Sequence, residues 1–226
     1  MSPIDLRLGR WQDVLADVTT CDAVICDPPY SARTHEGSDA VALRTVDGAD
    51  RQELGYAWLT PDDVRGIVDA WAPRCAGWMC AMTDDILSPA WREAFASVGR
   101  YDFAPVPILQ HRPRMSGDGP GSGAVYMLVS RPRESRFMSW GSLPCWYMST
   151  PEKGAVMGAK PLGLMRAIVR DYSRPGDLIV DPFCGSGTTA LAAAMEGRRC
   201  ITSEEKPEHH AIAKRRLDRG YQPGLI

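Results

Sequence analysis

The chain has 226 residues, of which 44% are apolar and 24% are charged. At about 150 residues per domain, this length predicts a single domain over residues 1–226. The composition is typical of a globular protein and excludes disordered, collagen-like and coiled-coil classes. A net charge of -2 excludes a molecule that is basic overall, so any nucleic-acid surface must be local.

The N-terminus and the cysteines predict a cytoplasmic protein. Charged residues interrupt the first eleven residues, which excludes a secretory signal, and no apolar run reaches the roughly 18 residues of a membrane span. The seven cysteines include no Cys-x-x-Cys pair and no zinc-ligand spacing. We therefore expect no membrane contact and no metal site.

The first half of the chain alternates strand and helix patterns. Residues 21–26 form an apolar run stopped by two prolines, which predicts a buried strand. The polar residues 31–57 predict a long loop, and the Thr-Pro-Asp-Asp sequence from residue 60 predicts a helix to about residue 72. A strand over 77–82 and a helix over 89–97 complete a βαβ pattern.

The second half begins with an expected hairpin. Apolar runs at 103–110 and 124–130 flank a glycine-rich stretch, which predicts an antiparallel hairpin with a mobile tip. Residues 131–158 fit neither helix nor strand, and their aromatic residues either pack beneath this segment or stack on a ligand. The remaining expected elements are a helix at 160–172, a strand at 178–180, a helix at 188–196, a strand at 199–203 and a helix at 208–219.

The strongest chemical signal is the sequence LIVDPFCGSGTT over residues 178–189. It combines a strand, an acidic residue, Gly-x-Gly and a helix start, where free N–H groups and the positive end of the helix dipole favour ligand binding. About 20 residues later the next strand ends at Glu204, a spacing that suits a ribose-binding carboxylate. This region predicts a nucleoside-binding unit, although Gly-x-Gly alone is also consistent with a plain tight turn.

A second motif, Asp27-Pro28-Pro29-Tyr30, follows the first predicted strand. It places a carboxylate, a rigid turn with an outward carbonyl and an aromatic ring side by side. Alone it is also consistent with a strand-terminating turn.

Together the two motifs resemble the S-adenosylmethionine-dependent amino methyltransferases of DNA, which make N6-methyladenine or N4-methylcytosine. The order of motifs, catalytic first and cofactor late, is similar to the β group of that family. Lys160-Pro161 and the segment after Glu204 also resemble it, so the likeness is tight at 21–30 and 158–219 and loose between.

The chemistry of amine methylation suits the residues of the catalytic motif. An exocyclic amine is a poor nucleophile, so acceptors that attract its hydrogens and localise its lone pair assist attack on the methyl group. We expect the Asp27 carboxylate and the Pro28 carbonyl to be those acceptors, with Pro29 fixing the turn. Tyr30 offers a face on which a base rotated out of the duplex would stack.

The resemblance also implies a binding site for S-adenosylmethionine. Glu204 is expected to bind the ribose and Lys160 to complete the methionine end. The residues expected to contact the cofactor are Lys160, Asp181, Pro182, Phe183, Gly185, Ser186, Gly187, Thr188 and Glu204.

The expected fold is α/β, a Rossmann-like αβα sandwich. Its sheet should be mixed and mostly parallel, with an antiparallel terminal hairpin and a permuted motif order. Both motifs would then lie at the carboxyl ends of strands, where open α/β sheets bind ligands.

The expected activity is methylation of the N6 amine of adenine in DNA. In the family that the motif resembles, Asp at the first position of the motif, here Asp27, favours adenine, whereas Ser at that position is associated with cytosine. The alternatives are N4-cytosine methylation, methylation of RNA or protein, and a non-catalytic nucleic-acid-binding module. RNA and protein methyltransferases usually place the glycine motif first, which argues against them.

Residues 131–158 are the candidate target-recognition segment. The segment is short, which predicts relaxed sequence specificity and help from a second subunit, as in a homodimer. Any restriction enzyme paired with this protein would be a separate chain.

Overall fold

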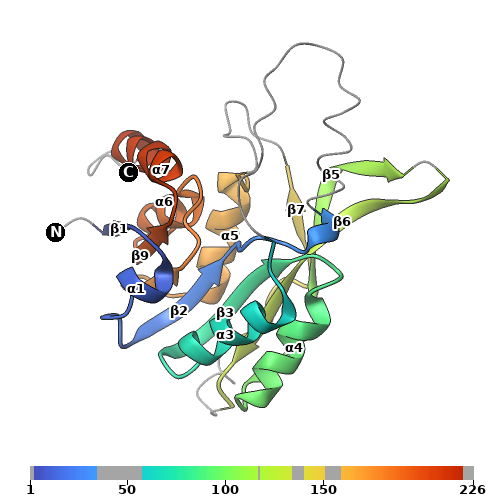
Figure 1. Ribbon diagram of the computed structural model, residues 1–226, viewed down its shortest axis with the longest axis horizontal. Coiled ribbons are helices and arrows are strands. Elements are labelled where there is room, and N and C mark those ends of the chain that lie inside the picture. Colours follow the sequence, from blue (N-terminus) through green and yellow to red (C-terminus); the bar gives the residue numbers. More distant parts are fainter. Residues whose placement is uncertain (1–2, 35–57, 117, 134–139, 151–158, 221–226) are drawn as a thin grey trace.

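The computed structural model describes residues 3–34, 58–116, 118–133, 140–150 and 159–220 (Figure 1). The strands are β1 (Ile4–Leu8), β2 (Cys21–Cys26), β3 (Cys75–Thr83), β4 (Tyr101–Asp102), β5 (Val106–Ser116), β6 (Gly119–Arg131), β7 (Tyr147–Ser149), β8 (Leu178–Asp181) and β9 (Arg199–Glu204). The helices are α1 (Trp11–Val14), α3 (Pro61–Trp71), α4 (Ser88–Ser97), α5 (Leu162–Tyr172), α6 (Thr188–Met195) and α7 (Pro207–Gly220).

The strands form one nine-stranded sheet in the order β1-β9-β8-β2-β3-β6-β5-β7, with β4 paired to β6. Neighbours from β1 to β3 are parallel, β6 is antiparallel to β3 and β5, and β7 is parallel to β5. Therefore β6 runs against the other strands, and the expected mixed, mostly parallel sheet is confirmed. The hairpin of β5 and β6 does not end the sheet, because β7 adds a strand beyond it.

Helices cover both faces of the sheet, which gives three layers (Figure 1). On one face α5 and α6 pack against Ala23 and Ile25 of β2, and on the other α3 and α4 pack against Val24 and Cys26. A strand covered on both faces needs apolar residues at every position, which explains the uninterrupted apolar run that ends β2.

Helix α3 begins where the sequence predicts, at the Thr-Pro-Asp-Asp motif. The Thr60 side chain accepts a hydrogen bond from the N–H of Asp63, and the Asp63 carboxylate accepts one from the N–H of Thr60. This capping box, with Pro61 in the first turn, satisfies N–H groups that a helix start leaves free. The predicted helix is confirmed, and it buries one apolar face against the sheet.

Several expectations need correction. Residues 131–158 contain a strand after all, because β7 pairs with β5 through Ile108 and Tyr147. At three residues β7 is too short to show a period in the sequence. The glycine-rich stretch is mostly strand, since pairing continues to Arg114 and Ser122. Of the expected loop over 31–57, residues 35–57 lie outside the described residues, and 32–34 form a helical turn.

Among the described helices, none has the length and apolar character needed to cross a membrane.

Candidate active site

Four carboxylates lie at the carboxyl ends of four neighbouring strands. Glu204 ends β9 and Asp181 ends β8, whereas Asp27 and Asp84 directly follow β2 and β3. These strands are adjacent in the order β9-β8-β2-β3, and neighbouring strands are about 4.8 Å apart. The sheet therefore brings the catalytic motif and the glycine motif to the same edge.

Lys160 holds the Asp27 carboxylate. Its Nζ donates to Oδ1 at 2.7 Å and to Oδ2 at 2.6 Å, and the Tyr30 hydroxyl donates to Oδ1 at 3.0 Å. The same Nζ lies 5.0 Å from the centre of the Tyr30 ring. The resemblance implied that Lys160 serves the methionine end of the cofactor, and its bond to Asp27 is a contact that the sequence did not predict.

Burial and charge act in opposite directions on Lys160. Burial alone would lower the pKa of its ammonium group, but the Asp27 carboxylate and the Tyr30 hydroxyl outweigh this effect and raise the pKa above its ordinary value. Burial also raises the pKa of Tyr30. At neutral pH, Lys160 is therefore a cation and Tyr30 a neutral hydroxyl donor.

The glycine loop turns through two left-handed residues, Gly185 at φ 53° and Gly187 at φ 80°. A side chain at Gly187 would meet Leu217 at 3.3 Å, whereas a Cβ at Gly185 would have no heavy atom within 4 Å. The Gly185 N–H donates to the Glu204 carboxylate at 2.9 Å. Gly187 is therefore needed for the packing of α7, while Gly185 leaves open space above the loop.

Asp181 is a buried carboxylate at the floor of this edge, with 1% of its surface exposed. Burial raises its pKa to about 7, although hydrogen bonds from the Phe183 N–H and the Thr189 hydroxyl act to lower it. The nearby carboxylates of Asp27 and Glu204 raise it further. A cation placed here would favour the ionised form of Asp181.

Helix α7 supports the glycine loop from outside through Arg216. Its guanidinium donates to the Ser186 carbonyl at 3.1 Å, to the Ser186 hydroxyl at 2.8 Å and to the Thr188 hydroxyl at 2.6 Å. The Pro182 carbonyl accepts a hydrogen bond from the Ser203 hydroxyl at 3.0 Å, which ties the loop to β9. Both ends of the loop are thus fixed by side chains.

Asp84 is a site residue that the sequence analysis missed. Its buried carboxylate accepts hydrogen bonds from the Ser31 N–H and hydroxyl, from the Thr34 hydroxyl at 2.6 Å and from the Leu87 N–H at 3.0 Å. Burial alone would raise the pKa of Asp84, but the bonds from Ser31 and Thr34 lower it. The signal was present, because Asp84 follows a strand as Asp27 does.

Two of the aromatic residues in 131–158 pack inside the molecule. The Trp140 ring meets Trp78 edge-on at 5.6 Å, and its Nε1 donates to the Asp171 carbonyl at 2.8 Å. Tyr147 is buried, and its hydroxyl donates to the Asp171 carboxylate at 2.6 Å. Packing therefore accounts for both side chains, whereas Trp146 is exposed.

A sequence profile described as DNA methylase, of the N6 and N4 type, matches residues 90–215, more than half of the chain. The chain belongs to the N6/N4 DNA methylase family. DNA adenine methyltransferase YhdJ of Escherichia coli strain K12 is 42% identical to this family member over 59 residues, which are 26% of this chain and 20% of that protein. The chain spans about half, or less, of the length of the curated relatives that it matches.

Solved structures share the fold of this family member along almost its whole length. The M1.HpyAVI-SAM complex has a TM-score of 0.67 and 18% identity, over 95% of this chain and 99% of that chain. The PvuII DNA methyltransferase, described as cytosine-N4-specific, has a TM-score of 0.65 and 15% identity, over 100% of this chain and 89% of that chain. At these identities the likeness establishes the α/β fold.

Proposed function

We propose that this protein transfers a methyl group from S-adenosylmethionine to the N6 amine of adenine in DNA. One observation carries the proposal: Asp27 and the glycine loop lie at the carboxyl ends of β2 and β8, which are adjacent parallel strands. Family membership supports the reaction class, and the closeness of the two motifs at one edge of the sheet supports a shared site for cofactor and base.

The glycine loop fits a cationic nucleoside cofactor. The space above Gly185, the start of α6 and the buried carboxylates of Asp181 and Glu204 together suit a ligand with ribose hydroxyls and positive charge. Bound there, S-adenosylmethionine would supply a methyl group already activated by its positive sulfur. Glu204 would accept from the ribose while its other oxygen keeps the loop in place.

The catalytic motif supplies acceptors for the amine. The Asp27 carboxylate and the Pro28 carbonyl would each accept one hydrogen of the exocyclic amine, which directs the lone pair toward the methyl group. Tyr30 would stack on the extruded base. Because Lys160 bonds both oxygens of Asp27, the amine must share the carboxylate with Lys160 or displace it.

Adenine is the proposed base, with N4 of cytosine as the second candidate. The Asp at position 27 supports adenine, as does the similarity to a protein named as an adenine methyltransferase. The second candidate rests on the N6/N4 family profile and on the fold shared with a cytosine-N4-specific enzyme.

Residues 131–158 are the proposed target-recognition segment, although Trp140 and Tyr147 within it serve packing. A homodimer and a separate restriction enzyme remain proposals about partners. Size-exclusion chromatography with light scattering, with and without DNA, tests the first of these.

A labelled-methyl assay tests the proposed activity. Purified protein is incubated with S-adenosylmethionine carrying a tritiated methyl group and with unmethylated DNA, RNA or protein extract, and the labelled DNA is digested to nucleosides. We expect label only in DNA and only in N6-methyladenine. Label in N4-methylcytosine would favour the second candidate, and label in RNA or protein would contradict the DNA assignment.

A further inference from the structure

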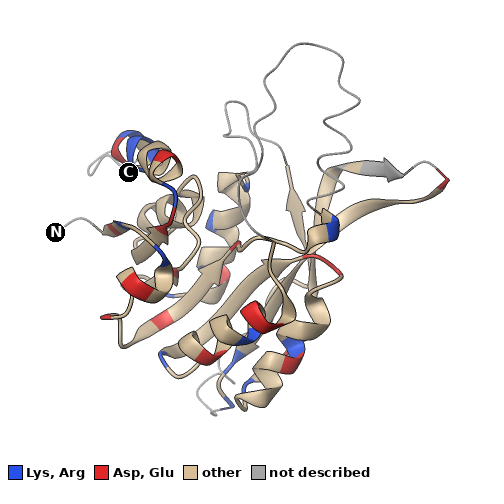
Figure 2. Ribbon diagram, viewed as in Figure 1, with Lys and Arg blue, Asp and Glu red and all other residues tan. Residues whose placement is uncertain are grey.

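Two exposed side chains of complementary chemistry flank the catalytic motif. Arg33 lies in the helical turn 32–34, three residues after Tyr30, and its side chain is exposed. Trp58 is 55% exposed, an unusual state for a large aromatic ring. In Figure 2 a basic segment is visible on the turn 32–34, above the sheet edge where β2 ends.

Hydrogen bonds to a buried carboxylate fix the turn that carries Arg33. Ser31, two residues before it, and Thr34, directly after it, donate hydrogen bonds to the buried Asp84 carboxylate. Their polar groups are thus directed inward, while the Arg33 guanidinium is on the solvent side. The backbone that carries this cation is thus already ordered before an anion binds.

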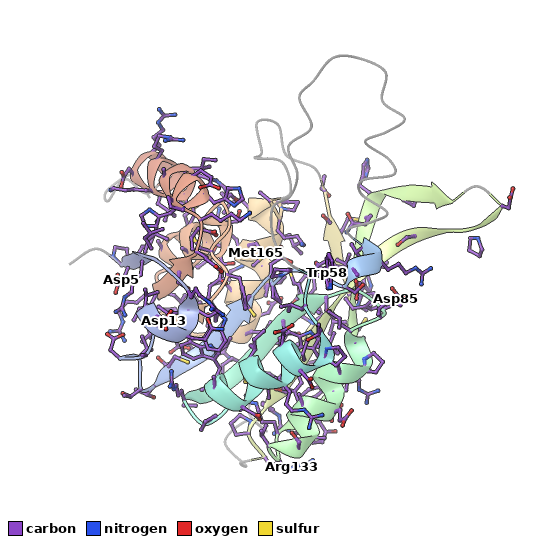
Figure 3. All side chains as sticks on the ribbon, viewed as in Figure 1. Asp5, Asp13, Trp58, Asp85, Arg133 and Met165 are labelled. Atoms are coloured by element: carbon purple, nitrogen blue, oxygen red, sulfur yellow. The ribbon has the colours of Figure 1, made fainter. Side chains whose placement is uncertain are left out.

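Trp58 is tied to the catalytic motif through its neighbour. The Leu59 N–H donates to the Tyr30 carbonyl at 3.1 Å, so Trp58 is one residue from a backbone partner of Tyr30. The capped helix α3 begins directly afterwards and fixes the chain on that side. Figure 3 shows Trp58 near Asp85, at the sheet edge far from Arg133.

We propose that Trp58 and Arg33 form a DNA-contact pair beside the catalytic motif, in which Trp58 stacks on the bases next to the extruded target and Arg33 binds a backbone phosphate. The proposal rests on the proposed function, since it assumes a base is rotated out of a duplex. Extrusion unstacks the neighbouring bases, and an exposed indole ring beside the catalytic motif would restore stacking to them. Arginine beside it supplies the charge that phosphates require.

The pair is tested by binding of a short unmethylated duplex in the presence of S-adenosylhomocysteine. The duplex carries the sequence found to be modified, or a random sequence if none is modified, and anisotropy is recorded from 50 to 200 mM salt. We expect Trp58→Ala to raise Kd about tenfold without changing the salt slope. Arg33→Ala should lower the salt slope by about one.

Matched controls lie at the opposite edge of the sheet. Tyr101, 42% exposed, begins β4, and the exposed Arg199 begins β9, so both are at the amino ends of strands that run parallel to β2. Tyr101→Ala and Arg199→Ala should leave Kd and salt slope unchanged. Cofactor affinity, measured by calorimetry, should be the same in all four variants and the parent, which shows that each variant is folded.

A duplex mispaired at the target base distinguishes stacking by Trp58 from a general contribution of Trp58 to DNA affinity. A mismatch reduces the work of extrusion, so Trp58→Ala should lose less affinity on a duplex mispaired at the target than on a paired one. The inference is overturned if Trp58→Ala binds like Tyr101→Ala, or if Arg33→Ala keeps the parent salt slope. A parent protein that methylates no DNA would instead overturn the proposed function, and one that binds no duplex would overturn both.

Discussion

The ion pair of Asp27 and Lys160 joins residues 133 positions apart in the chain. Their side chains are 24% and 17% exposed, so solvent screens this pair less than a surface pair. Since both carboxylate oxygens take part, removal of Lys160 would leave Asp27 partly buried without its cation.

A double-mutant cycle measures this pair. Asp27→Asn, Lys160→Met and the double variant are unfolded in urea, and we expect a coupling free energy of about 1–2 kcal/mol. Lys214 and Asp218 provide the control, because they form an ion pair at 3.2 Å with side chains 63% and 64% exposed. That control cycle should give less than about 0.5 kcal/mol, and equal couplings in the two cycles would contradict our description of the site.

The raised pKa of Asp181 predicts that cofactor binding depends on pH. Its pKa is raised to about 7, and a cationic ligand would lower it, so binding releases a proton and affinity rises with pH. We expect affinity for S-adenosylmethionine to be about tenfold weaker at pH 6 than at pH 8, because the ionised fraction falls by about that factor. Calorimetry in buffers of different ionisation enthalpy should detect the released proton.

Asp181→Asn serves as the control for this effect. The amide cannot ionise, so the variant should bind more weakly at pH 8 and show little change down to pH 6. A parent protein whose affinity is constant over this range would contradict the role of Asp181.

The sequence was sufficient to name most residues of the candidate site, but it did not predict the hydrogen bonds between their side chains. Asp27 and Glu204 are recognisable because Asp27 follows an apolar strand and Glu204 ends a strand about 20 residues after the glycine motif. The bond from Lys160 to Asp27 depends on how α5 and β2 are placed, and no local pattern encodes that placement. Asp84 could have been found by the strand-end rule, since it follows Thr83 at the end of β3.

At the scale of elements, Asp84 connects β3 to the turn that follows the catalytic motif. The Leu87 N–H donates to Oδ1, while Ser31 and Thr34 donate to Oδ2, so one carboxylate joins two loops. Hydrogen bonds to a buried charged acceptor are stronger than neutral ones.

We expect Asp84→Ala to lower the free energy of unfolding by about 2–3 kcal/mol, because several buried donors lose their acceptor. Turnover should fall through misplacement of the motif, while affinity for the cofactor stays unchanged. Urea unfolding, steady-state kinetics and calorimetry measure the three quantities.

The exposed neighbour Asp85 provides a matched substitution for this test. Asp85→Ala removes the same charge without the hydrogen bonds, and it should alter stability by less than about 0.5 kcal/mol. If the two variants behave alike, Asp84 does not position the catalytic motif.

Elements with a clear period were predictable, and short ones were not. The helices α3 and α5 bury one apolar face each, which gives the helical spacing visible in the sequence. Strands β4 and β7 have two and three residues, and long-range pairing alone makes them strands. The glycine-rich part of β5 and β6 is extended because the strands pair with one another, against the local preference for a turn.

At the scale of the whole molecule, the sheet order explains how distant motifs form one site. The chain passes from β2 through β3 to β7 before it returns to β8, which inserts beside β2. The two motifs are therefore far apart in the sequence but close in space, because β8, which leads into the glycine loop, lies beside β2, which ends at Asp27. Among the described residues, helices cover both faces of the central strands and leave the strand ends free for chemistry (Figure 1).

The central claim is that Asp27 acts in methyl transfer at a cofactor site formed by the glycine loop. The most direct measurement uses S-adenosylmethionine with a deuterated methyl group, unmethylated DNA, nucleoside digestion and mass spectrometry, with Asp27→Asn beside the parent protein. We predict deuterated N6-methyladenine from the parent and at least about a hundredfold less from Asp27→Asn, with cofactor affinity retained. Equal product from both proteins, or no methylated base from a parent protein that binds the cofactor, would contradict this account.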